Sequence, residues 1–149
     1  MNHLTLSIES DLHDVSLVAV SINAVCRQLG LDEAAAHEAE LCVVEATTNA
    51  VRHAYQCEPG HIVNIEVLEV GTQLHFEISD HGTPMPAPQV QRLIHGDPTS
   101  EANPITRATL SESGRGLQII HDLMDEITYS STNGTNRLTM KKSLPSTSN

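Results

Sequence analysis

The chain has 149 residues and a formal net charge of −11 at pH 7, with only 8 Lys and Arg side chains. This length suits one domain with its own core and is short for two. A general nucleic-acid-binding or anionic-membrane surface needs a concentrated basic footprint, which this composition excludes. We therefore expect no nucleic-acid or membrane partner, and any phosphate-bearing ligand must be held by a few local groups.

Cysteine usage and the N-terminus indicate the compartment. The three cysteines, Cys26, Cys42 and Cys57, form no CxxC pair and are odd in number, so we expect buried, reduced thiols. The opening "MNHLTLSIES" has no charged segment followed by an apolar run, and no stretch approaches the roughly 18 apolar residues of a membrane span. A cytoplasmic protein is the expectation.

The first third of the chain predicts a strand and two helices. "HLTLSIE" (3–9) alternates apolar and polar residues, as a half-buried strand does. Ser10 or Asp11 then caps a helix over 12–29, which Gly30 ends. Asp32 caps a second helix that runs to about Tyr55. We expect its core-facing stripe to consist of Ala34, His37, Leu41, Val44, Thr48, Val51 and Tyr55.

A polar stripe lies about 100° round from that apolar one. Glu45, Asn49 and His53 follow at steps of four in "EATTNAVRHAY", which aligns their side chains on one helix face. A solvated polar face is the simplest interpretation. Two threonines and a valine in mid-helix are poor helix formers, however, so a requirement of a site, or of tight packing, is the alternative.

The rest of the chain predicts two hairpins, a loop and a further helix. The strands at 61–70 and 72–79 join at Gly71-Thr72, a short helix covers 90–94, and residues 96–113 form a long polar loop. "SGRGL" leads into a helix, and a last hairpin turns at Asn133-Gly134. About three helices and five strands predict an α+β, two-layer fold, with a mixed, mostly antiparallel sheet covered on one face by helices. Residues 1–142 form the domain and 143–149 a disordered tail.

Two more motifs carry potential chemistry. In "ISDHGTP" a strand ends at Asp80, which can accept a hydrogen bond from an exocyclic amine, while Gly82 lets the backbone approach a flat ring. In "SGRGL" the glycines Gly114 and Gly116 would expose backbone N–H groups at a helix start, with Arg115 as an added cation. Ordinary tight turns explain either motif alone. The nine histidines show no HxH or HxxxH spacing, so we expect no histidine metal site.

The order and spacing of these motifs resemble the N, G1, G2 and G3 boxes of the GHKL ATPases. Within that superfamily the chain looks most like the small anti-sigma factor serine/threonine kinases of the RsbW and SpoIIAB type, whose helix reads E-A-x-x-N-A-x-x-H-x-Y. The string "GRGLQII" is similar to their second glycine box. The resemblance implies the histidine-kinase-like ATPase (Bergerat) fold.

The resemblance also implies roles for individual residues. Glu45 would be the general base, and Asn49 would ligate a Mg²⁺ ion that bridges the ATP phosphates. Asp80 would bind the adenine amino group, with Gly82 lining the base and Thr135 assisting through a water. Backbone groups of Gly114, Arg115, Gly116 and Leu117 would hold the phosphates beneath a lid at 96–113. The cation on the transferring phosphate would be Arg115 or Arg107, and His53 would pack or support the site.

One departure from the family pattern concerns the first glycine box. Thr83-Pro84 stand where many relatives carry a second glycine, so the loop after the adenine site is expected to be stiffer or differently placed.

Two functions from different classes follow. The first is an ATP- and Mg²⁺-dependent serine/threonine kinase that phosphorylates a STAS-domain antagonist and sequesters a sigma factor or another output protein. The second is a module that binds nucleotide and sequesters a partner without phosphorylating it, against which Glu45 speaks. A histidine kinase catalytic domain is a weaker third, because no helix pair with an acceptor His is present. The first strand and helix would form a homodimer or partner surface.

Overall fold

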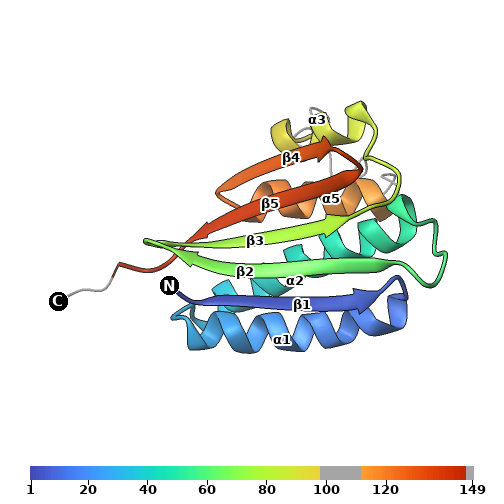
Figure 1. Ribbon diagram of the computed structural model, residues 1–149. Helices are drawn as coiled ribbons and strands as arrows, with labels where there is room; N and C mark the ends of the chain where they lie inside the picture. Colours follow the sequence, from blue (N-terminus) through green and yellow to red (C-terminus); the bar gives the residue numbers. More distant parts are fainter. Residues whose placement is uncertain (98–111, 147–149) are drawn as a thin grey trace.

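In the computed structural model, which describes residues 1–97 and 112–146, five antiparallel strands form one sheet and helices cover one of its faces (Figure 1). The strand order is β1-β2-β3-β5-β4. The strands are β1 (His3–Glu9), β2 (Ile62–Val70), β3 (Gln73–Asp80), β4 (Glu126–Thr132) and β5 (Thr135–Ser143). The expected two-layer α+β fold is confirmed, with no parallel pair among the described strands.

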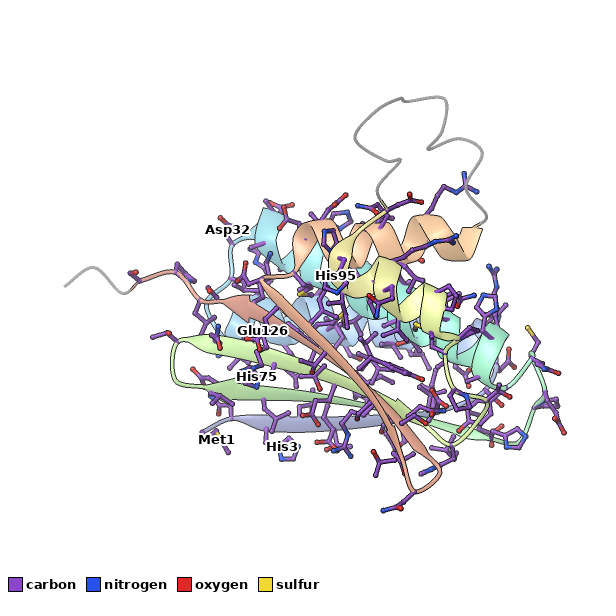
Figure 2. All side chains as sticks on the ribbon, turned by 90° about the horizontal axis from the view of Figure 1, so that it is seen from above. Met1, His3, Asp32, His75, His95 and Glu126 are labelled. Atoms are coloured by element: carbon purple, nitrogen blue, oxygen red, sulfur yellow. The ribbon has the colours of Figure 1, made fainter. Side chains whose placement is uncertain are left out.

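The helical layer consists of α1 (Val15–Gln28), α2 (Glu33–Asn49) and α5 (Glu112–Leu123), with α3 (Ala87–His95) beside α5 and β4. Asp32 and His95 lie at ends of helices in this layer, and His3, His75 and Glu126 lie on strands (Figure 2). Side chains from both layers form one core around Phe76, Ile65 and Val43. Of the described residues, none belongs to a helix that is long and apolar enough to cross a membrane.

The helix starts are explained by local capping. Asp11 accepts a hydrogen bond from the His13 N–H at 2.9 Å, at the start of a short 3-10 turn that leads into α1. Ser10 has another task, because its hydroxyl donates to the Glu58 carbonyl and accepts from the His61 N–H. Asp32 caps α2 as expected, accepting from the Ala35 N–H at 2.8 Å.

The predicted core stripe of the second helix is confirmed at its end, where Val51 and Tyr55 are buried, and is wrong within α2. Ala34 and His37 are exposed, and Leu41, Val44 and Thr48 are only half-buried. The face that packs into the core instead carries small side chains: Ala36, Ala39, Cys42, Val43, Ala46, Thr47 and Ala50. Because α2 packs closely against α1 on one side and α5 on the other, small residues occupy its inner face and the larger apolar ones lie at its edges.

The observed bounds of the last helix and the last strand also differ from the predicted ones. Helix α5 begins at Glu112, so the last two residues of the predicted 96–113 loop are helical. Residues 98–111 of that loop, which include Arg107, lie outside the described part of the chain. Strand β5 extends through Ser143, and the Leu144 N–H donates to the Thr72 carbonyl at 2.8 Å. Residues 147–149 of the predicted tail are outside the described part of the chain.

Candidate nucleotide site

A cavity of about 200 Å³ opens between the end of α2, the end of β3 and the β4–β5 hairpin. Its walls are mainly apolar and include Ala46, Ala50, Ile78, Leu138, Met85 and Tyr129. Polar groups reach it from Asn49, His53, Asp80, Gln89 and Asn136. Flat apolar walls with a few placed polar groups suit a planar heteroaromatic ring.

Asp80 lies at the end of β3 and is only 8% exposed. Its Oδ1 accepts hydrogen bonds from the Gly82 N–H at 2.9 Å and from Asn136 Nδ2 at 2.8 Å. No described residue donates to Oδ2. One oxygen of a buried carboxylate on the cavity wall is therefore left for a donor on a ligand.

Asn49 lines the cavity from the last position of α2, and its side-chain Nδ2 is buried with no hydrogen-bond partner among the described residues. A buried amide group without a partner is costly, so a ligand is the expected partner. The nitrogen and oxygen of an amide are assigned from their neighbours, and no described neighbour of Asn49 fixes them. With the oxygen turned toward the cavity, Asn49 offers the hard oxygen donor that Mg²⁺ prefers, so the residues present fit that ion.

Directly after Asn49 the helix widens into a π-helical turn, η2 (Ala50–Ala54). The Tyr55 N–H donates to the Ala50 carbonyl at 3.1 Å, five residues back. Single π turns in helices are frequent at functional sites. His53 lies within this turn. It is exposed and lines the cavity together with Asn49, so of its two predicted roles the placement favours support of the site over packing.

Gly82 packs against η2. The neighbouring Thr83 N–H donates to the Ala54 carbonyl at 2.9 Å, and a Cβ built on Gly82 would overlap that carbonyl and the Tyr55 ring. Glycine is therefore required because two backbone segments touch, and Gly82 itself is not among the residues that line the cavity.

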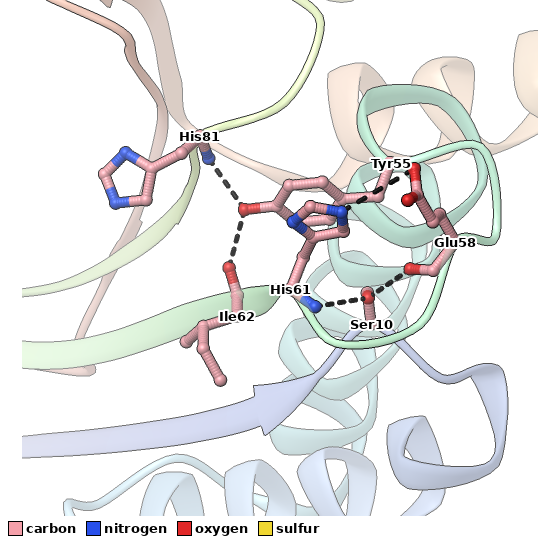
Figure 3. A network of polar contacts seen from close by, with 6 residues as sticks. All are labelled: Ser10, Tyr55, Glu58, His61, Ile62 and His81. Carbon is pink, nitrogen blue, oxygen red and sulfur yellow. Dashed lines mark hydrogen bonds and ion pairs between the residues drawn. The ribbon is translucent and has the colours of Figure 1, made fainter.

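The Tyr55 hydroxyl joins three segments around this contact (Figure 3). It donates to the Ile62 carbonyl and accepts from the His81 N–H, both at 2.8 Å. The Tyr55 ring stacks on His61 with centroids 4.6 Å apart, and His61 pairs with Glu58 at 3.7 Å. The turn after Asp80 is thereby tied to the end of α2 and the start of β2.

Glu45 lies one helical turn before Asn49, at the contact between α2 and α5. A Cβ built on Gly116 would overlap its Oε2 and lie 3.2 Å from its Cδ. Glu45 also contributes to raising the pKa of the Cys42 thiol, which reaches about 12 mainly because the thiol is buried. The carboxylate thus lies near the cavity without lining it.

The second glycine motif lies inside α5 and not in a turn before it. Gly114 and Arg115 are in the first turn of the helix, with Gly116 and Leu117 following. Arg115 is exposed, and Gly114, Gly116 and Leu117 are buried. The motif still occupies the positive end of a helix dipole, where anions bind. None of the four residues lines the cavity beside Asp80.

The adenine role assigned to Thr135 stays a prediction, and the placement of that residue gives it no support. Thr135 lies on the opposite side of β5 from the cavity, with its hydroxyl 3.3 Å from His81 Nδ1. The next residue, Asn136, faces the cavity and bonds to Asp80. Sequence reasoning missed Asn136, Tyr55 and Tyr129, and only the alternation of strand residues could have indicated Asn136.

No group of three or more His, Cys, Asp and Glu side chains able to hold a metal occurs within residues 1–97 and 112–146. The expectation of buried thiols is confirmed for Cys26 and Cys42 and is wrong for Cys57, which is exposed just after Tyr55 and Gln56.

Comparison with known proteins gives a consistent result. A family model described as "Histidine kinase-like ATPase domain" matches residues 8–142. The anti-sigma F factor of Anoxybacillus flavithermus is 30% identical over 135 residues, which cover 89% of this chain and 86% of that protein. The serine-protein kinase RsbW of Bacillus velezensis is 26% identical over 134 residues, covering 90% and 81%.

Solved structures agree on the fold. The RsbU and RsbW domains of a Mycobacterium tuberculosis protein superpose with a TM-score of 0.65 at 13% identity, covering 97% of this chain and 33% of that one. The histidine kinase AdeS of Acinetobacter baumannii superposes with a TM-score of 0.52 at 17% identity, covering 95% and 68%. This chain thus spans about one third of the length of the Mycobacterium tuberculosis chain.

Proposed function

The chain belongs to the histidine kinase-like ATPase domain family, and from this premise we propose that it is an ATP- and Mg²⁺-dependent serine/threonine protein kinase of a bacterial partner-switching pathway. Its substrate would be a serine on a STAS-domain antagonist protein. In its other state it would sequester a sigma factor or another output protein, acting in the cytoplasm.

The observation that carries this proposal is the pairing of Asn49 and Glu45 on one helix beside the cavity. The unpartnered amide of Asn49 supports a Mg²⁺ site, and the bound ion would neutralise phosphate charge. The carboxylate of Glu45, one turn earlier, can accept the proton from an incoming serine hydroxyl. Asp80 would hold the adenine amino group. Pure nucleotide binding requires no base next to the metal position.

A transfer assay with labelled ATP, Mg²⁺ and a STAS-domain antagonist protein as substrate tests the proposal. The wild type should transfer phosphate, and Glu45→Gln should reduce transfer by about 10²- to 10⁴-fold with ATP affinity retained. Asn49→Ala should lose Mg²⁺-dependent ATP binding. Glu33→Gln, an exposed carboxylate at the start of the same helix, is the control and should behave as wild type. Transfer that survives Glu45→Gln would remove Glu45 as the base.

The alternative is a module that binds nucleotide and sequesters its partner without phosphorylating it. It would be favoured by tight ATP binding with no transfer to any STAS-domain protein.

A homodimer or partner surface on β1 and α1 is part of the proposal. Leu17 and Val20 on the outer side of α1 are 65% and 71% exposed, and β1 is an edge strand of the sheet. Exposed apolar residues beside an open strand edge favour protein contact. We expect the wild type to sediment as a dimer and Val20→Asp to shift it toward monomer, and an unchanged mass would refute this surface.

A further inference from the structure

Three residues form a row across neighbouring strands beside the cavity, and two of them, Asp80 and Asn136, line it. Ser131 of β4 is opposite Asn136 of β5, and Asn136 is opposite Asp80 of β3. The Ser131 hydroxyl donates to Asn136 Oδ1 at 2.7 Å, and Asn136 Nδ2 donates to Asp80 Oδ1 at 2.8 Å. A hydrogen-bonded chain thus runs from the hairpin to the carboxylate.

The Asn136 amide is held in one orientation. It is 2% exposed, and Nδ2 also donates to the Gly82 carbonyl at 2.9 Å. Both amide hydrogens therefore have acceptors, and the amide oxygen has a hydroxyl donor. Turning the amide over would place its oxygen against a carboxylate and a carbonyl, so these three neighbours determine the assignment. Asn136 has no donor left for a ligand.

The fixed Asn136 amide in turn orients the carboxylate of Asp80. The donors from Asn136 and Gly82 both converge on Oδ1, which fixes the rotation of the carboxylate about its last bond. Oδ2, which no described residue contacts by hydrogen bond, is then presented as an acceptor at a defined place on the cavity wall. Without Asn136 the carboxylate could rotate, and an acceptor without a fixed direction discriminates poorly between ligands.

We infer that Asn136 is a positioning residue that sets base specificity through Asp80, so that the site selects a nucleotide whose base carries an exocyclic amino group. The inference rests on the proposed function only as far as nucleotide binding. Asn136 would act without touching the base, since its hydrogen-bonding groups are already used within the protein.

The test compares two nucleotides by calorimetric titration of the full chain with Mg²⁺: ATP, and purine riboside triphosphate, which lacks only the amino group. The wild type should bind ATP tighter by about 10- to 100-fold, the value of a hydrogen bond to a charged group. In Asn136→Ala this ratio should fall to within about threefold, with the affinity for the analogue little changed. Asn136→Thr keeps a hydroxyl donor and should retain most of the ratio.

Two further variants control for a general effect of mutating β5 and for misfolding of Asn136→Ala. Arg137→Ala, the next residue on β5 and on the other face of the sheet, should leave the ratio at the wild-type value. If Asn136→Ala does not fold, Ser131→Ala takes its place as the test. Ser131 is exposed, so its truncation should be tolerated, and its loss removes the hydroxyl that holds the Asn136 amide. The ratio of the two affinities should then fall several-fold. An unchanged ratio in that variant would overturn the inference.

The remaining outcomes separate this inference from the kinase proposal. A loss of affinity in Asn136→Ala that is equal for both nucleotides would show a merely structural role and overturn the inference, even if phosphate transfer occurs. A wild type without preference for ATP would overturn it as well. A ratio that depends on Asn136, in a protein that transfers no phosphate, would support it while the kinase proposal fails.

Discussion

Gly116 of α5 lies directly against the carboxylate of Glu45 on α2, so close that a methyl group on Gly116 would overlap Oε2. The atom in the way is the far end of a flexible side chain, and the Glu45 backbone is not involved. The two motifs that the sequence places some 70 residues apart are therefore coupled through space, and a single methyl group can displace the proposed base.

Gly116→Ala should separate catalysis from stability. The atom that the new methyl group meets is the end of the flexible Glu45 side chain and not backbone, and alanine favours a helix by up to about 1 kcal/mol over glycine. We expect an unfolding free energy equal to or above that of the wild type, together with phosphate transfer reduced by at least about tenfold. Urea unfolding and a transfer assay measure the two quantities. In a Glu45→Ala background, Gly116→Ala should have no further effect on transfer, and an additive loss would contradict the coupling.

Gly82→Ala, the same substitution in the other glycine motif, should give the opposite result. Its Cβ would meet the Ala54 carbonyl, which is backbone and has no freedom to swing aside. We expect a loss of about 1–3 kcal/mol in unfolding free energy, as for other overpacked sites, and weaker ATP binding because the turn after Asp80 is displaced. A Gly82→Ala protein as stable as Gly116→Ala would show that η2 can shift.

The alternation of strand residues, together with the turn signals at Gly71-Thr72 and Asn133-Gly134, was sufficient to predict the five described strands and both hairpins. A period of two leaves little doubt about which side chains share a face, and the turns at Gly71-Thr72 and Asn133-Gly134 set the registers. The α2 stripe failed for the complementary reason: its inner face is marked by alanines and Cys42, which carry little apolar signal, while Leu41 and Val44 lie at the edges.

The candidate site was predictable where several motifs in a family order could be read together. Asn49 and Asp80 lie in such motifs, received their roles from the family resemblance, and both line the cavity. Asn136 was missed because its role depends on the register between β3 and β5, which no local pattern states. The π turn after Asn49 was missed because an extra residue in a helical turn changes no periodicity that a short segment can reveal.

Tyr55→Phe should loosen the turn that carries Asp80. The substitution leaves the His81 N–H and the Ile62 carbonyl without their partner, while the ring and its stacking on His61 remain. We expect a loss of about 1–3 kcal/mol in unfolding free energy and a higher Kd for ATP. His61→Gln is the matched control: it removes the stacked ring but keeps the Tyr55 hydroxyl, so the Kd should stay close to that of the wild type. Equal effects of both substitutions would assign the role to stacking.

The buried thiols predict both a labelling pattern and a dependence of stability on pH. Burial raises the pKa of Cys26 and of Cys42 to about 12, whereas Cys57 is exposed. At pH 8 a thiol reagent should therefore label one cysteine per native chain and three in denaturant. Cys57→Ser should abolish the native signal. Two labelled thiols in the native wild type would show that α1 or α2 opens.

The sign of the pH effect follows from the direction of these shifts. A thiol whose pKa is near 9 when unfolded and about 12 when folded is protonated in both states below pH 9, and its stabilising effect is then fully present. Above pH 9 the unfolded chain ionises first, so the urea midpoint should fall as pH rises from 9 to 10. Tyr55 and Tyr129 add to this decline toward pH 10, because burial also raises their pKa. Cys26→Ala with Cys42→Ala should lower the midpoint at pH 7, because two buried side chains are shortened, but should flatten its decline above pH 9. An equally steep decline in that variant would show that other groups govern alkaline unfolding.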